Sequence, residues 1–253
     1  MIYIGYDLLS NAALKKMQFF KKDKLAYFIS SMLAGIYVGL CMITILIMAG
    51  MLPDFGGIKI IQGASFAAAL SLIVFAGAEL FTGNVFVMTA GVMKNTVKLF
   101  DACKLCLFCY LGNFAGSVVI SALFWGTGYL KDAVLIEAVK MINDKTAPIF
   151  WELFIRGILC NMLICVGVWC VYRMQSETGK LIMLFWSFYI FVVSGFEHSI
   201  ANMTLFNLGS FAGEYSGISF LYMLKNIEAT SSGNLLGGVI LALAYWFLSR
   251  HIP

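Results

Sequence analysis

The chain has 253 residues, of which 61% are hydrophobic and only 12% are charged, whereas about a quarter of the residues of a soluble domain are charged. This composition excludes an ordinary soluble protein and indicates an integral membrane protein, for which the lipid bilayer is a partner. The net charge of +4 does not call for a nucleic-acid partner, because a basic rim facing anionic lipid accounts for it.

The first predicted element covers residues 2–22. It lacks the order of basic end, apolar stretch and small-residue cleavage site that marks a signal peptide. We expect residues 1–24 to form a cytoplasmic amphipathic helix that lies on the membrane surface.

Six apolar stretches follow, each long enough to cross a bilayer, which takes about 20 residues. They lie near 25–52, 63–93, 105–128, 148–172, 181–208 and 233–250. Most lysines and arginines fall in segments that are inside if the N-terminus is inside, as is usual for the cytoplasmic side. The sequence therefore predicts six crossings with both termini in the cytoplasm.

Two motifs recur along the chain. G-x-E-x-x-x-x-N occurs at 77–84 and 195–202, G-N-x-x-G occurs at 112–116 and 233–237, and Gly35-Ile36 matches Gly157-Ile158 more loosely. The glycines also suit tight helix packing. With three crossings in each copy, the second copy enters the membrane from the opposite side. We expect an all-α membrane protein with inverted three-helix repeats at 25–128 and 148–253, joined by an extracellular linker at 129–147.

The second and fifth apolar stretches are longer than a crossing requires, and each carries its polar motif partway along. Helix breaks at this depth are tolerated only where protein or a water-filled cavity satisfies the backbone. We expect breaks at 77–84 and 194–202, where Glu79 and Glu197 accept hydrogen bonds from freed backbone N–H groups. Asn84 and Asn202 would satisfy other loose polar groups.

His198 stands inside the second of these breaks. It aligns with Leu80 of the other copy, so the repeat itself does not call for an imidazole there. An ionisable group within the membrane is a functional candidate, and histidine is the side chain that titrates near neutral pH. The alternative is a purely structural histidine.

Metal and enzyme chemistry have little support in the sequence. Cys103, Cys106 and Cys109 only faintly resemble an iron–sulfur ligand run, and we expect them to be packing residues. The Glu197-His198 pair is not part of an H-E-x-x-H motif, and one buried histidine does not make a zinc site with three protein ligands. We therefore expect no metal, no other cofactor and no enzyme activity.

Three segments carry a resemblance to a known family. AELFTGN (78–84), RGILCNMLICVGVW (156–169) and SGFEHSIANM (194–203) closely resemble the signatures of the formate/nitrite transporter family, which includes formate, nitrite and hydrosulfide channels. The resemblance spans all six apolar stretches. It implies an aquaporin-like fold, a homopentamer in which each protomer encloses its own pore, and a place in a bacterial cytoplasmic (inner) membrane.

The resemblance also implies roles for particular residues. His198 matches the central histidine, and Thr82 matches the threonine of the broken second helix. Asn161 matches the asparagine of the fourth crossing, and Lys145, which we expect in a loop, matches the lysine before that crossing. The implied hydrophobic constrictions contain Leu80 and Phe81 and, more loosely, Phe66, Leu70, Ile164 and Phe191. Ordinary apolar packing and a solvated loop charge are the alternatives for the looser set and for Lys145.

The expected function is a channel for a small monovalent anion, either hydrosulfide, formate or nitrite, or for its conjugate weak acid. A bare anion in hydrocarbon faces an idealised cost on the order of 20 kcal/mol. Lys145 would concentrate anions at the mouth, and apolar rings would exclude water and large ions. His198, Thr82 and Asn161 would meet the anion between them, and protonation of the anion would lower its desolvation cost.

Two other transport mechanisms compete with this expectation. A proton-coupled secondary transporter of the same anions would use the same residues. A water or glycerol channel also has inverted halves, but it carries Asn-Pro-Ala at both half-helix starts, and no proline stands in either predicted break. The signatures lean toward the hydrosulfide or formate branches without deciding which anion is carried.

Overall fold

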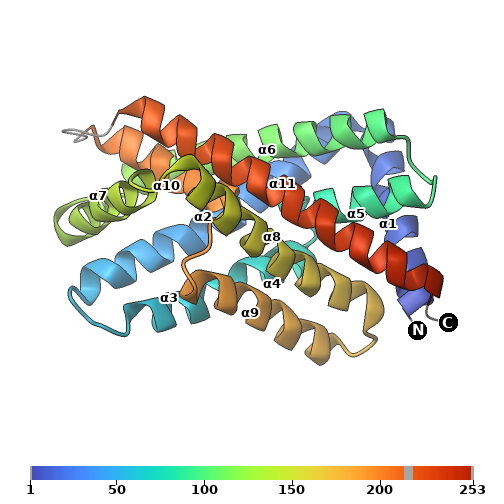
Figure 1. Cartoon of the computed structure of the whole chain (residues 1–253). Coiled ribbons are helices and arrows are strands. Elements are labelled where there is room, and N and C mark those ends of the chain that lie inside the picture. The colour runs from blue at the N-terminus through green and yellow to red at the C-terminus, as the bar shows by residue number, and fades with distance from the viewer. Residues whose placement is uncertain (1, 214–218, 252–253) are drawn as a thin grey trace.

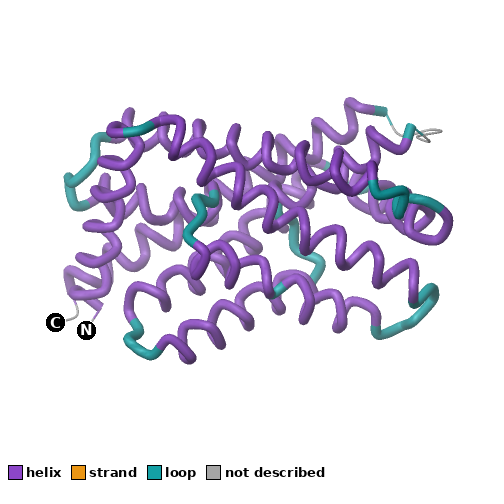
Figure 2. The backbone as a smooth tube through the Cα atoms, turned by 180° about the vertical axis from the view of Figure 1, so that it is seen from behind, coloured by secondary structure: helices purple, strands orange, loops and turns teal. Residues whose placement is uncertain are grey.

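The computed structural model describes residues 2–213 and 219–251, which form helices and no strand (Figures 1 and 2). The helices are α1 (Ile2–Lys22), α2 (Lys24–Met51), α3 (Ile58–Phe66), α4 (Ala68–Ala76), α5 (Phe81–Met93), α6 (Leu99–Gly126), α7 (Asp132–Thr146), α8 (Phe150–Arg173), α9 (Glu177–Val193), α10 (Ser199–Ala212) and α11 (Phe220–His251). Within the described part, five segments are long and apolar enough to cross a membrane: α2, α3 with α4, α6, α8 and α11.

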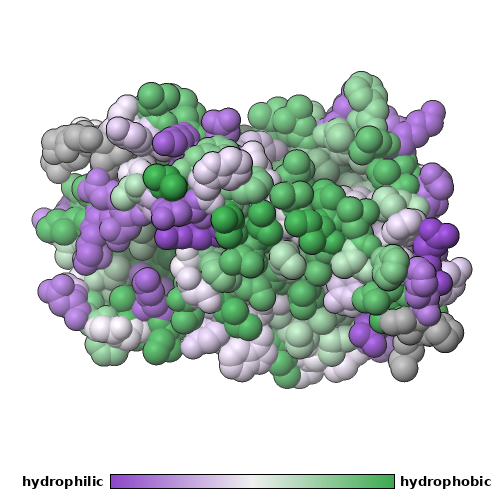
Figure 3. Space-filling model, viewed as in Figure 1, coloured by the Kyte–Doolittle hydropathy of each residue, from purple (hydrophilic) through white to green (hydrophobic). Residues whose placement is uncertain are grey.

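The molecule is an elongated helical bundle with α7 at one end and α1, together with both termini, at the other (Figure 1). Hydrophobic residues cover much of the middle of the visible face, and hydrophilic residues gather mainly toward the two ends (Figure 3). The chain is therefore a multi-pass membrane protein.

Helix α1 forms where the sequence predicts it, but its apolar face does not lie on the lipid surface. That face packs against α5, α8 and α11, and the Tyr6 hydroxyl donates to the Ala242 carbonyl at 3.2 Å. The spacing of the buried residues is typical of an amphipathic helix seated on a core. The buried hydrophobic residues of α1 are Tyr6, Leu9, Ala13, Met17 and Phe20.

The predicted linker at 129–147 is largely helical. Residues Asp132–Thr146 form α7, which packs against α2 and α10. Ala138 and Ile142, one turn apart, are its buried residues, so one apolar stripe is enough to seat it. Lys145 therefore lies in the last turn of a helix, where a cation is favourable, and not in a loop.

Helices α2 and α6 approach each other through small residues. A Cβ on Gly116 of α6 would overlap the backbone carbonyl of Met32 in α2. Likewise, a Cβ on Gly237 of α11 would overlap the carbonyl of Ile158 in α8. Because a backbone cannot yield as a flexible side chain does, these glycines fix two matching helix pairs at short range.

The close contact at Gly116 leads to a prediction. Gly116→Ala is expected to lower stability by about 2 kcal/mol, the middle of the range for overpacking, and to lower the thermal midpoint in detergent. Gly126→Ala, in the same helix but with open space around it, is the control and should leave the midpoint unchanged. Equal midpoints for the two variants would show that α2 and α6 are not in this contact.

Two irregular segments interrupt the helices inside the bundle. Helix α4 ends at Ala76 and α5 begins at Phe81, while α9 ends at Val193 and α10 begins at Ser199. Gly77 and Gly195 take positive φ values of 78° and 69°, which glycine adopts without steric cost. These segments, 77–80 and 194–198, are shorter than the predicted breaks, because Asn84 and Asn202 already lie inside helices.

Candidate functional site

Asn113 in α6 holds the first irregular segment. Its Oδ1 accepts from the Phe81 backbone N–H at 2.9 Å. Its Nδ2 donates to the Ser31 carbonyl at 2.7 Å and to the Glu79 carbonyl at 2.9 Å. The side chain therefore satisfies backbone groups within the irregular segment, at the start of α5 and in α2, which would otherwise be costly in an apolar interior.

Asn234 in α11 repeats this arrangement at the second segment. Its Oδ1 accepts from the Ser199 N–H at 3.0 Å, and its Nδ2 donates to the carbonyls of Gly157 at 2.8 Å and Glu197 at 2.9 Å. Both asparagines belong to the repeated G-N-x-x-G motif, but nothing in the motif predicts which groups their side chains bond.

These bonds correct one of the repeat alignments. Asn113 contacts Ser31 where Asn234 contacts Gly157, so Ser31 corresponds to Gly157, and the looser match of Gly35 with Gly157 is about one helical turn out of register. The Glu79 N–H donates to Ser30 and the Glu197 N–H donates to Arg156, at 3.2 and 3.4 Å, in the same corrected register.

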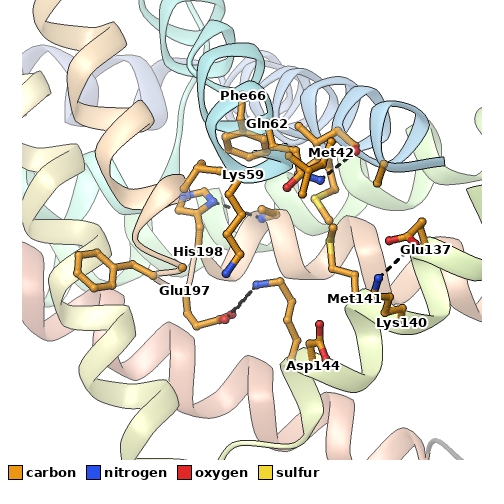
Figure 4. A pocket seen from close by; sticks show the side chains of 18 of the residues that line it. Met42, Lys59, Gln62, Phe66, Glu137, Lys140, Met141, Asp144, Glu197 and His198 are labelled. Atoms are coloured by element: carbon orange, nitrogen blue, oxygen red, sulfur yellow. Dashed lines mark hydrogen bonds and ion pairs between the residues drawn. The ribbon is translucent and has the colours of Figure 1, made fainter. Parts of the chain in front are cut away.

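The two glutamates are bonded to side chains. The prediction that they accept hydrogen bonds from freed backbone N–H groups is wrong. Lys145 Nζ donates to both carboxylate oxygens of Glu197 at 3.0 and 2.9 Å, marked by the dashed line at Glu197 in Figure 4, and Asn202 Nδ2 donates at 2.6 Å. Within the described residues no backbone N–H reaches either carboxylate. The prediction of their partners was wrong because the asparagines of α6 and α11 take the backbone groups.

Glu79 has a matching set of partners. Lys16 Nζ donates to its two oxygens at 2.6 and 2.7 Å, Asn84 Nδ2 donates at 2.8 Å, and the Tyr27 hydroxyl donates at 3.0 Å. Burial disfavours the Lys16 ammonium, but the Glu79 carboxylate more than offsets this, so the pKa of Lys16 lies above its ordinary value. Sequence reasoning missed Lys16, because nothing in its own helix points to a partner 63 residues away.

His198 is the N-cap of α10. Its Nδ1 accepts from the Ala201 N–H at 3.3 Å, and its Nε2 lies 3.3 Å from the Thr82 hydroxyl oxygen of α5. A ring nitrogen that accepts from a backbone N–H carries no proton, so the neutral ring is protonated at Nε2. The imidazole therefore directs a donor toward Thr82, where the first turns of α5 and α10 meet.

Asn161 of α8 stands behind Thr82. Its Nδ2 donates to the Thr82 carbonyl at 3.2 Å and also to the Asn234 carbonyl. Both amide hydrogens are thus used on backbone oxygens. Asn161 positions the backbones of Thr82 and Asn234, and it has no hydrogen left to donate to a solute.

Aromatic rings surround the imidazole. The ring centroids of Phe191 and Phe188 lie 5.9 and 6.3 Å from that of His198, and Phe66 stacks on Phe188 at 6.0 Å. All three phenylalanines are buried. Phe188 was missed by the sequence analysis, because it is one of many aromatic residues in an apolar helix.

Two cavities approach this point from opposite ends. A cavity of about 540 Å³, here called the α7-side cavity, is lined by Phe66, Phe191 and His198 and by charged residues of α7 (Figure 4). A second cavity of about 340 Å³, the α1-side cavity, is lined by Lys16, Glu79, Leu70 and Leu80 among others. The imidazole therefore borders one cavity, and two leucines border the other.

Two residues of the expected constrictions line neither cavity. Phe81 lines an apolar groove between α5, α6 and α11, and its ring centroid lies 4.9 Å from that of Tyr110. Ile164, a residue of α8, is fully buried in the core. Of these two neighbours in the chain, Leu80 borders the α1-side cavity and Phe81, the first residue of α5, borders the groove.

Comparisons with known proteins agree with this architecture. Residues 5–247 match the family model described as Formate/nitrite transporter. The nitrite transporter NirC of Salmonella typhimurium is 36% identical over 229 residues, which cover 89% of this chain and 84% of NirC. The formate channel FocA of Escherichia coli K12 is 28% identical over 273 residues, which cover 96% and 95% of the two chains.

Solved structures give the same result. An FNT family ion channel matches with a TM-score of 0.90 and 33% identity, over 96% of this chain and 98% of that one. A pentameric formate channel with formate bound matches with a TM-score of 0.78 and 25% identity, over 91% and 99%. These relatives are transporters and channels and not enzymes. Family model, relatives and fold all cover nearly the whole length, and the chain belongs to the formate/nitrite transporter family.

Proposed function

We propose that the chain is a channel for a small monovalent anion, formate or nitrite, or for its conjugate weak acid. The solute would pass from the α7-side cavity, past His198 and Thr82, to the α1-side cavity. One observation carries this proposal: the Nε2 of His198 faces the Thr82 hydroxyl at 3.3 Å between the two cavities, inside a wall of apolar side chains.

The proposal includes six crossings arranged as two inverted repeats in an aquaporin-like fold. The crossings would be α2, α3 to α5, α6, α8, α9 with α10, and α11, and the second and fifth would be broken. The matching bonds of Asn113 and Asn234 support this arrangement. So does the position of both termini at one end of the molecule (Figure 1), because an even number of crossings returns the chain to the side on which it began.

The electrostatics at the meeting point favour an anionic or hydrogen-bonding solute. The first turns of α5 and α10 meet there, and helix N-termini carry partial positive charge. The Nε2–H of His198 and the hydroxyl of Thr82 are donors. These groups return only part of the cost of desolvating a bare anion, so we propose that a proton crosses with it.

The bond at Nδ1 bears on where that proton resides. An imidazolium would place a second N–H against the Ala201 N–H and would lose the cap. The neutral ring with Nε2–H is the resting form in this proposal. The anion takes up a proton from the aqueous side, not from Nε2–H, and crosses as the weak acid. A proton-coupled transporter of the same anions is the alternative, favoured by the same imidazole.

We propose a supporting role for Lys145. Its ammonium is bonded to both oxygens of Glu197, so much of its charge is compensated within the cavity wall. In this position it holds Glu197, which in turn accepts from Asn202 of α10, and it contributes less to attracting anions than an unpaired cation would.

Assembly and location follow from the relatives and from the charge pattern. We propose a homopentamer, since one similar solved structure is a pentameric formate channel. We also propose a bacterial inner membrane with α1 and both termini in the cytoplasm, because most lysines and arginines then lie inside.

Reconstitution tests the proposed function. Proteoliposomes should take up formate or nitrite faster than protein-free liposomes in a stopped-flow assay. Hydrosulfide, which the same donors would accept, is measured beside them. Glycerol uptake should equal that of protein-free liposomes. An absence of flux for all three anions, or a fast glycerol flux, would contradict the proposal.

A further inference from the structure

The charged residues of the α7-side cavity fall into paired and unpaired groups. Lys145 pairs with Glu197 at 2.9 Å, and Lys140 pairs with Glu137 at 3.4 Å. Two further cations, Lys59 and Arg156, also line this cavity. Neither forms an ion pair with any residue of the ranges 2–213 and 219–251.

Lys59 is the better placed of these two cations. It lies in the first turn of α3 and is exposed. Figure 4 shows its side chain extending into the cavity, from the side of Phe66 and Gln62 toward Glu197. An ammonium group held by no carboxylate keeps its full field in the water that fills the entrance.

Among the described residues that line the α1-side cavity, none is a cation equivalent to Lys59. The offset of 118 that aligns Gly77 with Gly195 places Glu177 at the position of Lys59, and Glu177 pairs with Lys180 at 2.7 Å. In the corrected register, Ser30 stands where Arg156 stands in the other half. The charged residues that line the α1-side cavity, Lys16 and Glu79, are bonded to each other.

Acidic residues of the α7-side cavity oppose the attraction of an anion by Lys59. Asp54 and Asp144 also line the α7-side cavity, and both are exposed. The formal charges of the whole lining therefore balance, and the local position of Lys59 matters more than the total. Removing one of these carboxylates should have the opposite effect to removing Lys59.

We propose that Lys59 captures the permeating anion at the entrance of the α7-side cavity, the role that the sequence analysis gave to Lys145. The proposal rests on the proposed function, since it names the group that concentrates the anion before it reaches His198. It also ties the effect to one end: because Lys59 lines the α7-side cavity, its removal should slow the entry of anions from the α7 side at low ionic strength.

Substitutions at Lys59 in proteoliposomes test the proposal. For channels with the α7 side outward, Lys59→Gln should lower the initial rate of formate uptake about threefold, the Boltzmann factor of one charge at a separation on the order of 7 Å in water. Lys59→Glu should lower it further, and Lys59→Arg should keep the wild-type rate. At about 1 M salt, where the Debye length is about 3 Å, the differences should disappear.

Two further variants complete the test. Lys131→Gln removes the same charge from an exposed lysine that does not line the cavity, and it should leave the rate unchanged. Asp144→Asn should raise the rate at low salt. Wild-type rates in Lys59→Gln and Lys59→Glu would overturn this inference, while the absence of uptake by the wild-type protein would overturn the proposed function itself.

Discussion

Replacing His198 with leucine is expected to slow formate or nitrite uptake by roughly 10-fold to 100-fold. A solute oxygen left without its hydrogen bond in an apolar interior costs about 1–3 kcal/mol, and leucine cannot donate to the passing solute. The substitution also removes the N-cap bond to Ala201, which should lower stability by about 1 kcal/mol. Stopped-flow flux in proteoliposomes and the thermal midpoint in detergent measure the two effects separately.

His198→Asn is the control that separates the N-cap bond from the contact with the solute. Asparagine is among the best N-caps, so its side-chain oxygen can accept the Ala201 N–H, but it does not titrate near neutral pH. The thermal midpoint should therefore stay near that of the wild-type protein. Uptake should remain slow, because the shorter asparagine does not place its Nδ2 donors where the imidazole Nε2 lies beside Thr82. Wild-type flux with an unchanged pH dependence in this variant would rule out a role for the imidazole in permeation.

Breaking the ion pair between Lys145 and Glu197 is expected to cost about 3 kcal/mol of stability. The side chain of Glu197 is only 4% exposed and that of Lys145 is 19% exposed, so either single replacement leaves a largely buried charge without its partner. Lys145→Met and Glu197→Gln should each lower the thermal midpoint. The double variant should regain most of the loss, because no uncompensated charge remains.

The same variants decide what Lys145 does. If the lysine braces Glu197, the double variant should conduct anions at close to the wild-type rate. Lys140→Met is the control, because it breaks the ion pair with Glu137, in which the lysine side chain is 57% exposed. It should change stability by less than about 1 kcal/mol. A stable double variant with anion flux at least tenfold lower would show instead that Lys145 acts on the anion directly.

Much of the site was visible in the sequence because polar groups inside an apolar run need partners. Glu79, Glu197 and His198 were singled out on this ground, and the structure brings His198 next to Thr82. The repeated motifs also contain Asn113 and Asn234. The structure shows that these two side chains hold the irregular segments.

The features that could not be predicted from the sequence depend on contacts between segments that are distant in the chain. Lys16 meets Glu79 only because α1 packs on the core, and an amphipathic pattern does not say whether protein or lipid covers it. Phe81 follows Leu80 in the chain, yet the two side chains face a groove and a cavity on different sides of α5. The sequence alignment of α2 with α8, which matched Gly35 to Gly157, was wrong by about one helical turn. Glycines recur too often in these helices to fix an alignment.

The central claim is that the anion crosses together with a proton, as the weak acid, past a neutral imidazole. The most direct test is to load proteoliposomes with a pH-sensitive dye and to measure lumenal acidification and formate uptake in the same vesicles. The account predicts that the lumen acidifies in step with uptake, at a rate that does not depend on the membrane potential. Uptake that follows the membrane potential without acidification would contradict it.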